Sequence, residues 1–137
     1  MEDTSPPPAQ QPEARVLLAD DSPIEREALA HLLRQAGYQV DEADDGEAAI
    51  LFLKQKLPDL LLLDLQMPEL DGFDVLNYIA EHRRSLPVIL LSGMPPEDIQ
   101  DKMLSLRSRE LPPLLLKPVD PEQLVEIVEL QLSGNLP

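Results

Sequence analysis

The most informative segment for the fold of this chain is Leu60-Leu61-Leu62-Leu63-Asp64-Leu65-Gln66-Met67-Pro68. Its four consecutive leucines would make a strand that is apolar on both faces, and such a strand belongs at the centre of a sheet covered by helices. A parallel sheet buried on both sides is the usual setting for such a strand. Further strands, and helices that cover them, are therefore expected on both sides of this stretch.

Short apolar runs alternate with helix-period segments on both sides of the central run. The predicted strands are 16–19, 38–43, 60–63, 88–91 and 114–116. The predicted helices are 24–36, 45–55, 73–83, a weaker one around Ile99, Met103 and Leu106, and one that begins at Asp120. Five strands that alternate with five helices predict an α/β fold, in which a doubly wound five-stranded parallel sheet carries helices on both faces.

The first predicted helix has clear start and stop signals. Ser22 is expected to be the N-cap, Pro23 occupies the first helical position, and Glu25 would complete a capping box with Ser22. Gly37 supplies the stop. The apolar positions expected to face the core are Ile24, Ala28, Leu29, Leu32, Leu33 and Ala36.

Length and composition favour one domain. The 137 residues suit a single core. We expect a disordered proline-rich leader at 1–14, the folded domain at 15–132 and a short tail at 133–137. The chain has no cysteine, which excludes disulfides and cysteine-ligated metals.

The net charge and the lengths of the apolar segments indicate which classes of partner and which cellular location to expect. A formal net charge of -15 argues against nucleic acid and anionic membranes as partners. The start of the chain is acidic and proline-rich, unlike a secretory signal, and no segment approaches a membrane span. We therefore expect a cytoplasmic protein.

Chemistry-bearing residues stand where four of the five predicted strands end. Asp20 and Asp21 follow the first strand, Asp64 the third, Ser92 the fourth and Lys117 the fifth. In a doubly wound sheet the ligand site lies beyond the carboxyl ends of the strands. We therefore expect three carboxylates, a hydroxyl and an ammonium in one crevice.

Three crowded carboxylates repel one another unless a cation neutralises them. Their oxygen ligands favour Mg²⁺, which keeps positions open for waters and phosphate oxygens. If Asp64 offers a free oxygen to a phosphoryl group, the product is an acyl phosphate. Lys117 and Ser92 would then contact the phosphoryl oxygens. The predicted chemistry is phosphoryl transfer to Asp64.

Four motifs in the order of the chain resemble the receiver domain of response regulators, a CheY-like, flavodoxin-like (βα)5 fold. They are Asp20-Asp21, the segment from Asp64 to Gly72, Ser92-Gly93 and Lys117-Pro118. The resemblance covers residues 15 to about 132. It implies a two-component phosphoprotein that requires Mg²⁺ and receives its phosphoryl group from a histidine kinase or a phosphotransfer domain.

The resemblance also assigns a role to each site residue. Asp64 would be the acceptor and Asp21 a direct metal ligand, while Asp20 would act largely through metal-bound water. The Gln66 backbone carbonyl would be a further ligand, and Ser92 and Lys117 would hold the phosphoryl oxygens. The chain would thus be a phosphoacceptor that catalyses its own Mg²⁺-dependent phosphorylation and dephosphorylation, not an enzyme that acts on other substrates. In this family the Lys-Pro bond is usually cis.

The sequence departs from the family in the region that normally responds to phosphorylation. Leu114 stands where the family usually has an aromatic switch residue, and Pro112-Pro113 precede the last strand. Our main hypothesis is a stand-alone response regulator that binds an output protein through its fourth helix, fifth strand and fifth helix. The alternative is a receiver-like module whose interactions do not depend on phosphorylation. A haloacid-dehalogenase-like phosphatase would need a second acid where Gln66 stands.

Overall fold

The computed structural model describes residues 14–67, 71–83, 85–95, 97–99 and 112–133. The strands are β1 (Arg15–Ala19), β2 (Gln39–Ala43), β3 (Leu60–Asp64), β4 (Val88–Ser92) and β5 (Leu114–Leu116). The helices are α1 (Pro23–Gln35), α2 (Gly46–Gln55), α3 (Gly72–His82) and α5 (Pro121–Leu132). Each predicted strand and each of these four predicted helices is confirmed, with shifts of a single residue at some ends.

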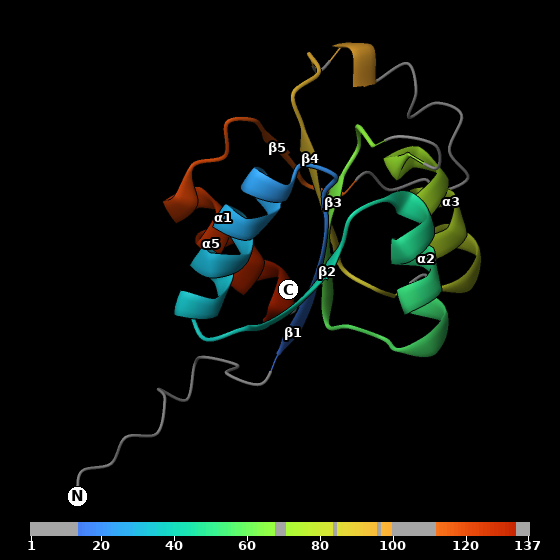
Figure 1. Ribbon diagram of the computed structural model, residues 1–137, viewed down its shortest axis with the longest axis horizontal. Coiled ribbons are helices and arrows are strands. Elements are labelled where there is room, and N and C mark those ends of the chain that lie inside the picture. The colour runs from blue at the N-terminus through green and yellow to red at the C-terminus, as the bar shows by residue number, and fades with distance from the viewer. Residues whose placement is uncertain (1–13, 68–70, 84, 96, 100–111, 134–137) are drawn as a thin grey trace, which may run out of the picture.

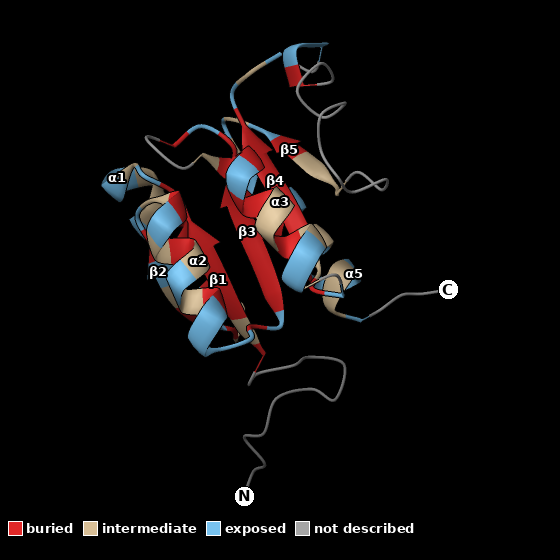
Figure 2. Ribbon diagram, turned by 90° about the vertical axis from the view of Figure 1, so that its right-hand side faces the viewer, coloured by how far each residue is buried: buried red, intermediate tan, exposed pale blue. Residues whose placement is uncertain are grey.

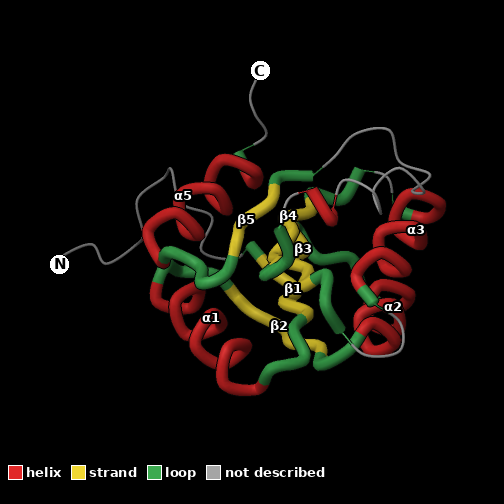
Figure 3. Tube along the Cα trace, turned by 90° about the horizontal axis from the view of Figure 1, so that it is seen from above, coloured by secondary structure: helices red, strands yellow, loops and turns green. Residues whose placement is uncertain are grey.

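The five strands form one parallel sheet in the order β2-β1-β3-β4-β5. Helices α1 and α5 cover one face and α2 and α3 the other, as Figures 1 and 3 show. The predicted doubly wound α/β fold is therefore confirmed. Because all the strands run in the same direction, their carboxyl ends lie along one edge of the sheet.

The core consists of two apolar layers, one on each face of the sheet. Every residue of β3 and β4 is buried (Figure 2). Successive leucines of β3 point to opposite faces, so that Leu61 and Leu63 join the layer under α2 and α3, while Leu60 and Leu62 join the layer under α1 and α5. The unbroken leucine run thus serves both layers.

Three predictions about α1 were wrong: the burial of Ile24, the burial of Ala28, which is exposed, and the complete capping box. Ile24 is 84% exposed, because it lies in the first turn of a helix that starts beyond the carboxyl edge of the sheet. Leu29 and Leu33 are buried as predicted, and Ala30, which was not predicted to face the core, is buried with them. The capping box is only half formed: the Ser22 hydroxyl accepts a hydrogen bond from the Glu25 N–H at 3.3 Å, but the Ser22 N–H donates to Asp20 and not to Glu25.

Other details of the predicted organisation also differ. Ala14, the last residue of the predicted leader, is buried, and its carbonyl accepts a hydrogen bond from the Gln39 N–H at 3.0 Å. Met103 and Leu106 of the weaker fourth helix lie outside the described residues, although Ile99 is buried.

Gly37 has a φ of 103°, which suits the predicted helix stop. Within the described part of the chain, no helix is long and apolar enough to span a membrane.

Candidate functional site

The predicted acids meet at the carboxyl edge of the sheet. Asp20 and Asp21 follow β1, Asp64 ends the adjacent β3, and one carboxylate oxygen from each lies within 4.8 Å of the other two. Asp20 is 0% exposed and Asp64 1% exposed, whereas Asp21 is exposed to solvent. The carboxyl groups of Asp20 and Asp64 are therefore almost fully removed from solvent, and that of Asp21 lies beside them at the surface.

Asp20 is poorly compensated for its burial. Its Oδ1 accepts a hydrogen bond from the Ser22 N–H at 2.9 Å, but its Oδ2 is buried without a hydrogen-bond partner among the described residues. Burial raises the pKa of Asp20 to about 7, the Ser22 hydrogen bond opposes this rise, and the nearby carboxyls of Glu25 and Asp64 add to it. The ionised Asp20 carboxylate therefore lacks a partner for its Oδ2 among the described residues, and a bound cation would be such a partner.

This arrangement fits a hard divalent cation. Three carboxylates within 4.8 Å offer oxygen ligands alone, and the unpartnered Asp20 Oδ2 is the kind of atom that an ion would satisfy. Gln66, the fourth predicted ligand, lies two residues after Asp64 and donates its N–H to Asp64 Oδ1 at 2.9 Å. Its side chain is used elsewhere, because its Oε1 accepts from the Gly93 N–H at 3.1 Å.

Lys117 reaches the same site from the end of β5. Its Nζ lies 3.0 Å from Asp64 Oδ2 and 2.9 Å from Glu25 Oε1. Burial lowers the pKa of Lys117, but its contacts with Glu25 and Asp64 outweigh burial and leave the pKa above its ordinary value. Lys117 is therefore a permanent cation at the edge of the acid cluster. The Lys117-Pro118 peptide bond is cis, as the family resemblance implies.

Ser92 ends β4 and is 0% exposed. Its Oγ accepts a hydrogen bond from the Met94 N–H at 2.9 Å, which leaves the hydroxyl hydrogen available to donate. Its backbone carbonyl accepts from the Lys117 N–H at 2.9 Å, so the two residues are tied together at the ends of neighbouring strands.

Sequence reasoning missed two residues of the site. Glu25 was assigned to capping, yet it is a fourth acid and contacts Lys117. The signal was its position one helical turn after Asp21, which puts both at the same end of α1. Gly72 was named as the end of the Asp64 motif, but its role was missed: a Cβ there would lie 2.6 Å from Leu65 Cα and 2.7 Å from the Asp64 carbonyl oxygen. Only glycine lets α3 start against the end of β3.

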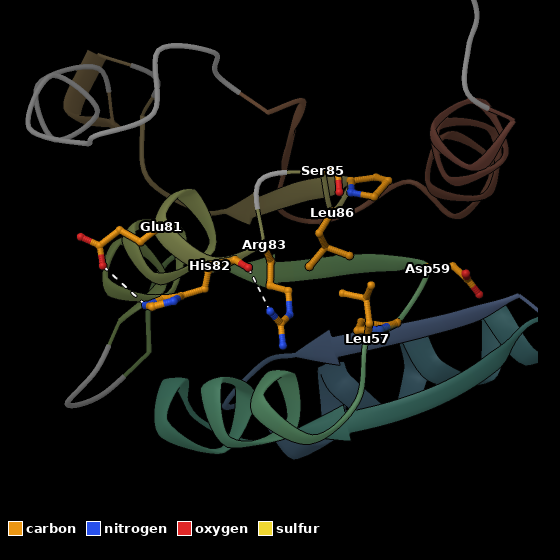
Figure 4. A pocket seen from close by; sticks show the side chains of 9 residues that line it. Leu57, Asp59, Glu81, His82, Arg83, Ser85 and Leu86 are labelled. Carbon is orange, nitrogen blue, oxygen red and sulfur yellow. Dashed lines mark hydrogen bonds and ion pairs between the residues drawn. The ribbon is translucent and has the colours of Figure 1, made fainter.

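A hollow of about 430 Å³ lies at the opposite edge of the sheet, between the segments that follow α2 and α3 (Figure 4). Arg83, one of its lining residues, donates to the Leu53 carbonyl at 3.0 Å and to the His82 carbonyl at 2.9 Å. Arg83 thus places a cation near the C-terminal end of α2, where the helix dipole favours it. None of the predicted site residues lines this hollow.

Comparison with known proteins agrees with this geometry. The family model described as the response regulator receiver domain matches residues 16–129. The transcriptional regulatory protein PdtaR of Mycobacterium tuberculosis is 34% identical over 87% of this chain, which spans 57% of that protein's length. Protein PilH of Pseudomonas aeruginosa is 34% identical over 88% of this chain and 99% of its own length.

Solved structures give the same result. The signal receiver domain of a histidine kinase from Syntrophus aciditrophicus has a TM-score of 0.78 at 32% identity and covers 88% of this chain and 91% of its own. The response regulator TrrA of Thermotoga maritima, solved in complex with Mg²⁺-BeF, has a TM-score of 0.73 at 28% identity, with coverage of 85% and 96%. With the sheet order, the clustered acids and these similarities together, the chain belongs to the family of response regulator receiver domains.

Proposed function

We propose that Asp64 accepts a phosphoryl group from a phosphohistidine of a sensor histidine kinase or a phosphotransfer protein. One observation carries this proposal: a carboxylate that is 1% exposed lies within 4.8 Å of two other carboxylates and 3.0 Å from the Lys117 ammonium. Burying a charge is costly unless it is paired, so this position is hard to explain as a purely structural one. Aspartate in such a setting can act as a nucleophile.

The proposed reaction is an in-line transfer. An Asp64 oxygen forms a bond to phosphorus while the phosphorus–nitrogen bond of the donor breaks, and the electron pair of that bond leaves with the donor nitrogen, which takes up a proton. Lys117 offers its charge to the phosphoryl oxygens and Ser92 its hydroxyl hydrogen. The chain would thus promote its own phosphorylation. Attack by water on the phosphorus would break its bond to the Asp64 oxygen, which releases inorganic phosphate and restores the carboxylate.

Mg²⁺ is the proposed cofactor. Asp20, Asp21 and Asp64, with the Gln66 backbone carbonyl, would hold it. When bound, the ion supplies positive charge for the phosphoryl oxygens that approach Asp64. The buried Asp20 Oδ2, which has no hydrogen-bond partner among the described residues, supports this assignment. TrrA, which was solved with Mg²⁺-BeF, is a precedent within the family.

The proposed output is a change in affinity for a partner protein in the cytoplasm. We assign it to the face formed by the predicted fourth helix, β5 and α5; β5 and α5 are described, whereas Met103 and Leu106 of the predicted fourth helix lie outside the described residues. Leu116 and Leu130 are 47% and 61% exposed and belong to β5 and α5. Leu114, at the position of the usual aromatic residue, is half-buried and packs against the core.

Intact-mass measurement with a small-molecule phosphodonor tests the acceptor. We expect one phosphoryl mass on the wild type with Mg²⁺, none with a chelator and none on Asp64→Ala. Asp74→Ala, which removes an exposed acid at the start of α3, is the matched control and should label normally. Undiminished labelling of Asp64→Ala would refute the assignment.

Partner capture separates this function from the phosphate-independent alternative. We expect more of the output protein on the wild type with beryllofluoride than without it, and no such increase on Asp64→Ala. Equal capture in all of these states would favour the alternative, which the relatives do not support. Turnover of a generic phosphomonoester would point instead to a phosphatase.

A further inference from the structure

Glu25 connects the first turn of α1 to the lysine of the site. Its Oε1 lies 2.9 Å from Lys117 Nζ, slightly closer than Asp64 Oδ2 at 3.0 Å. The side chains of Lys117 and Glu25 are 20% and 28% exposed, so solvent screens this pair only partly. The ammonium is therefore shared between two carboxylates, one on the acceptor and one on α1.

The local role expected for Glu25 in the helix cap is not the one observed. The Ser22 N–H, which a capping-box glutamate would bind, already donates to Asp20 Oδ1 at 2.9 Å. The backbone N–H of Glu25 serves the cap by donating to Ser22 Oγ, and this contact does not involve the carboxylate. The carboxylate of Glu25 is thus free of the cap and engaged with Lys117.

A phosphoryl group on Asp64 would change the demand on Lys117. Phosphoryl transfer places more negative charge beside the ammonium, which must then turn its hydrogen bonds toward the phosphoryl oxygens. Glu25 opposes this in two ways: it holds one of the Lys117 hydrogen bonds, and its own charge repels the incoming anion.

We propose that Glu25 is a positioning residue that competes with the phosphoryl group for Lys117 and so holds back phosphorylation of Asp64. This inference rests on the proposed function of Asp64. It assigns to Glu25 of α1 an inhibitory effect that acts through Lys117, beside the contribution of the same carboxyl to the raised pKa of Asp20.

The test compares Glu25→Gln with Glu27→Gln. Glu25→Gln keeps the shape of the side chain and the backbone cap but removes the charge that faces Lys117. Glu27→Gln removes one charge from the exposed side of the same helix and is the matched control. For each protein we would measure the labelling rate with phosphoramidate by intact mass, and the affinities for Mg²⁺ alone and for beryllofluoride at saturating Mg²⁺ by calorimetry.

We expect Glu25→Gln to raise the labelling rate and the beryllofluoride affinity on the order of tenfold, as suits the loss of one nearby charge in a partly solvated site. The affinity for Mg²⁺ alone should not rise, because a negative charge near the cation is lost. Glu27→Gln should match the wild type within about twofold. A higher beryllofluoride affinity of Glu25→Gln would distinguish competition for Lys117 from a structural role, because loss of a purely structural contact would lower that affinity.

Three results would overturn the inference. Slower labelling or weaker beryllofluoride binding by Glu25→Gln would mean that Glu25 helps to place Lys117 for transfer. Equal behaviour of the two variants would mean that the contact has no effect on the reaction. Absence of labelling on the wild type itself would remove the proposed function together with the inference, whereas the first two results leave that function standing.

Discussion

Replacing Asp20 by asparagine should stabilise the metal-free protein. Asp20 is fully buried, its Oδ2 lacks a hydrogen-bond partner among the described residues, and burial raises its pKa to about 7 from 3.8. Asparagine removes the charge, keeps an oxygen for the Ser22 N–H, and offers an amide to the carboxylates of Glu25 and Asp64. The change therefore replaces an unfavourable buried anion with a neutral hydrogen-bonding group.

The magnitude follows from the pKa. One pKa unit corresponds to about 1.4 kcal/mol, so the rise from 3.8 to about 7 corresponds to a penalty of about 4 kcal/mol for ionised Asp20 above pH 7. We take this as the upper bound and expect Asp20→Asn to raise the free energy of unfolding by about 2–4 kcal/mol at pH 8.

The pH dependence has a definite sign. Because the pKa of Asp20 is higher in the folded chain than in the unfolded chain, the folded state binds more protons between about pH 4 and pH 7. The contribution of Asp20 to stability is fully present below about pH 4 and is lost as the pH rises through about 7. The advantage of Asp20→Asn should therefore grow over this interval and level off above it.

Urea unfolding followed by circular dichroism is the assay, since the chain has no tryptophan to report by fluorescence. Asp21→Asn is the matched control: it removes a charge from the same cluster, but from an exposed side chain, and should gain less than about 1 kcal/mol. Saturating Mg²⁺ should stabilise the wild type more than Asp20→Asn. A metal-free Asp20→Asn no more stable than the wild type at pH 8, or an advantage that does not vary with pH, would refute the reasoning.

Other substitutions probe the supports of the site. Gly72→Ala should destabilise the chain by about 1–3 kcal/mol in urea unfolding, because the new Cβ would lie 2.6 Å from a backbone carbon. Gly93→Ala is the comparison: among the described residues, its Cβ would meet only a side-chain oxygen at 3.5 Å, and it should be nearly neutral. Arg26→Ala removes a 2.7 Å hydrogen bond to the Asp20 carbonyl. It should lower the free energy of unfolding by about 1–2 kcal/mol and weaken Mg²⁺ binding in calorimetry. An unchanged Mg²⁺ affinity would argue against a role of Arg26 in placing the acids. Lys117→Met should slow labelling by phosphoramidate roughly 100-fold without weakening Mg²⁺ binding, and labelling near the wild-type rate would remove the lysine from the proposed mechanism.

Local patterns were enough to predict the architecture. The leucine run of β3 and the alternation around it indicated a parallel sheet, because a strand buried on both faces needs helices on both sides. Asp20, Asp64 and Lys117 could be placed at one edge because each follows a predicted strand, and parallel strands end on the same side. For these features, the hydrophobic periodicity of the chain was enough to predict where the residues lie in space.

Contacts between distant segments could not be read in the same way. Glu25 looked like a capping residue, and only the tertiary structure shows that Lys117, the residue after β5, reaches its carboxylate in the first turn of α1. Ile24 fell on the apolar period of the helix, yet the first turn of α1 extends past the sheet and leaves it exposed. A periodic pattern describes which residues share a face, but it does not say where the neighbouring element ends.

Sequence patterns were therefore sufficient to predict the fold, the edge at which the acids gather and the candidate acceptor. The burial of Asp20, the two carboxylates that share Lys117 and the need for glycine at position 72 become visible only in the folded chain. The physical reason is that hydrophobic periodicity is a local property of the chain. Desolvation, ion pairing and close approach depend instead on distances between elements, and these are set only when the sheet and its helices pack together.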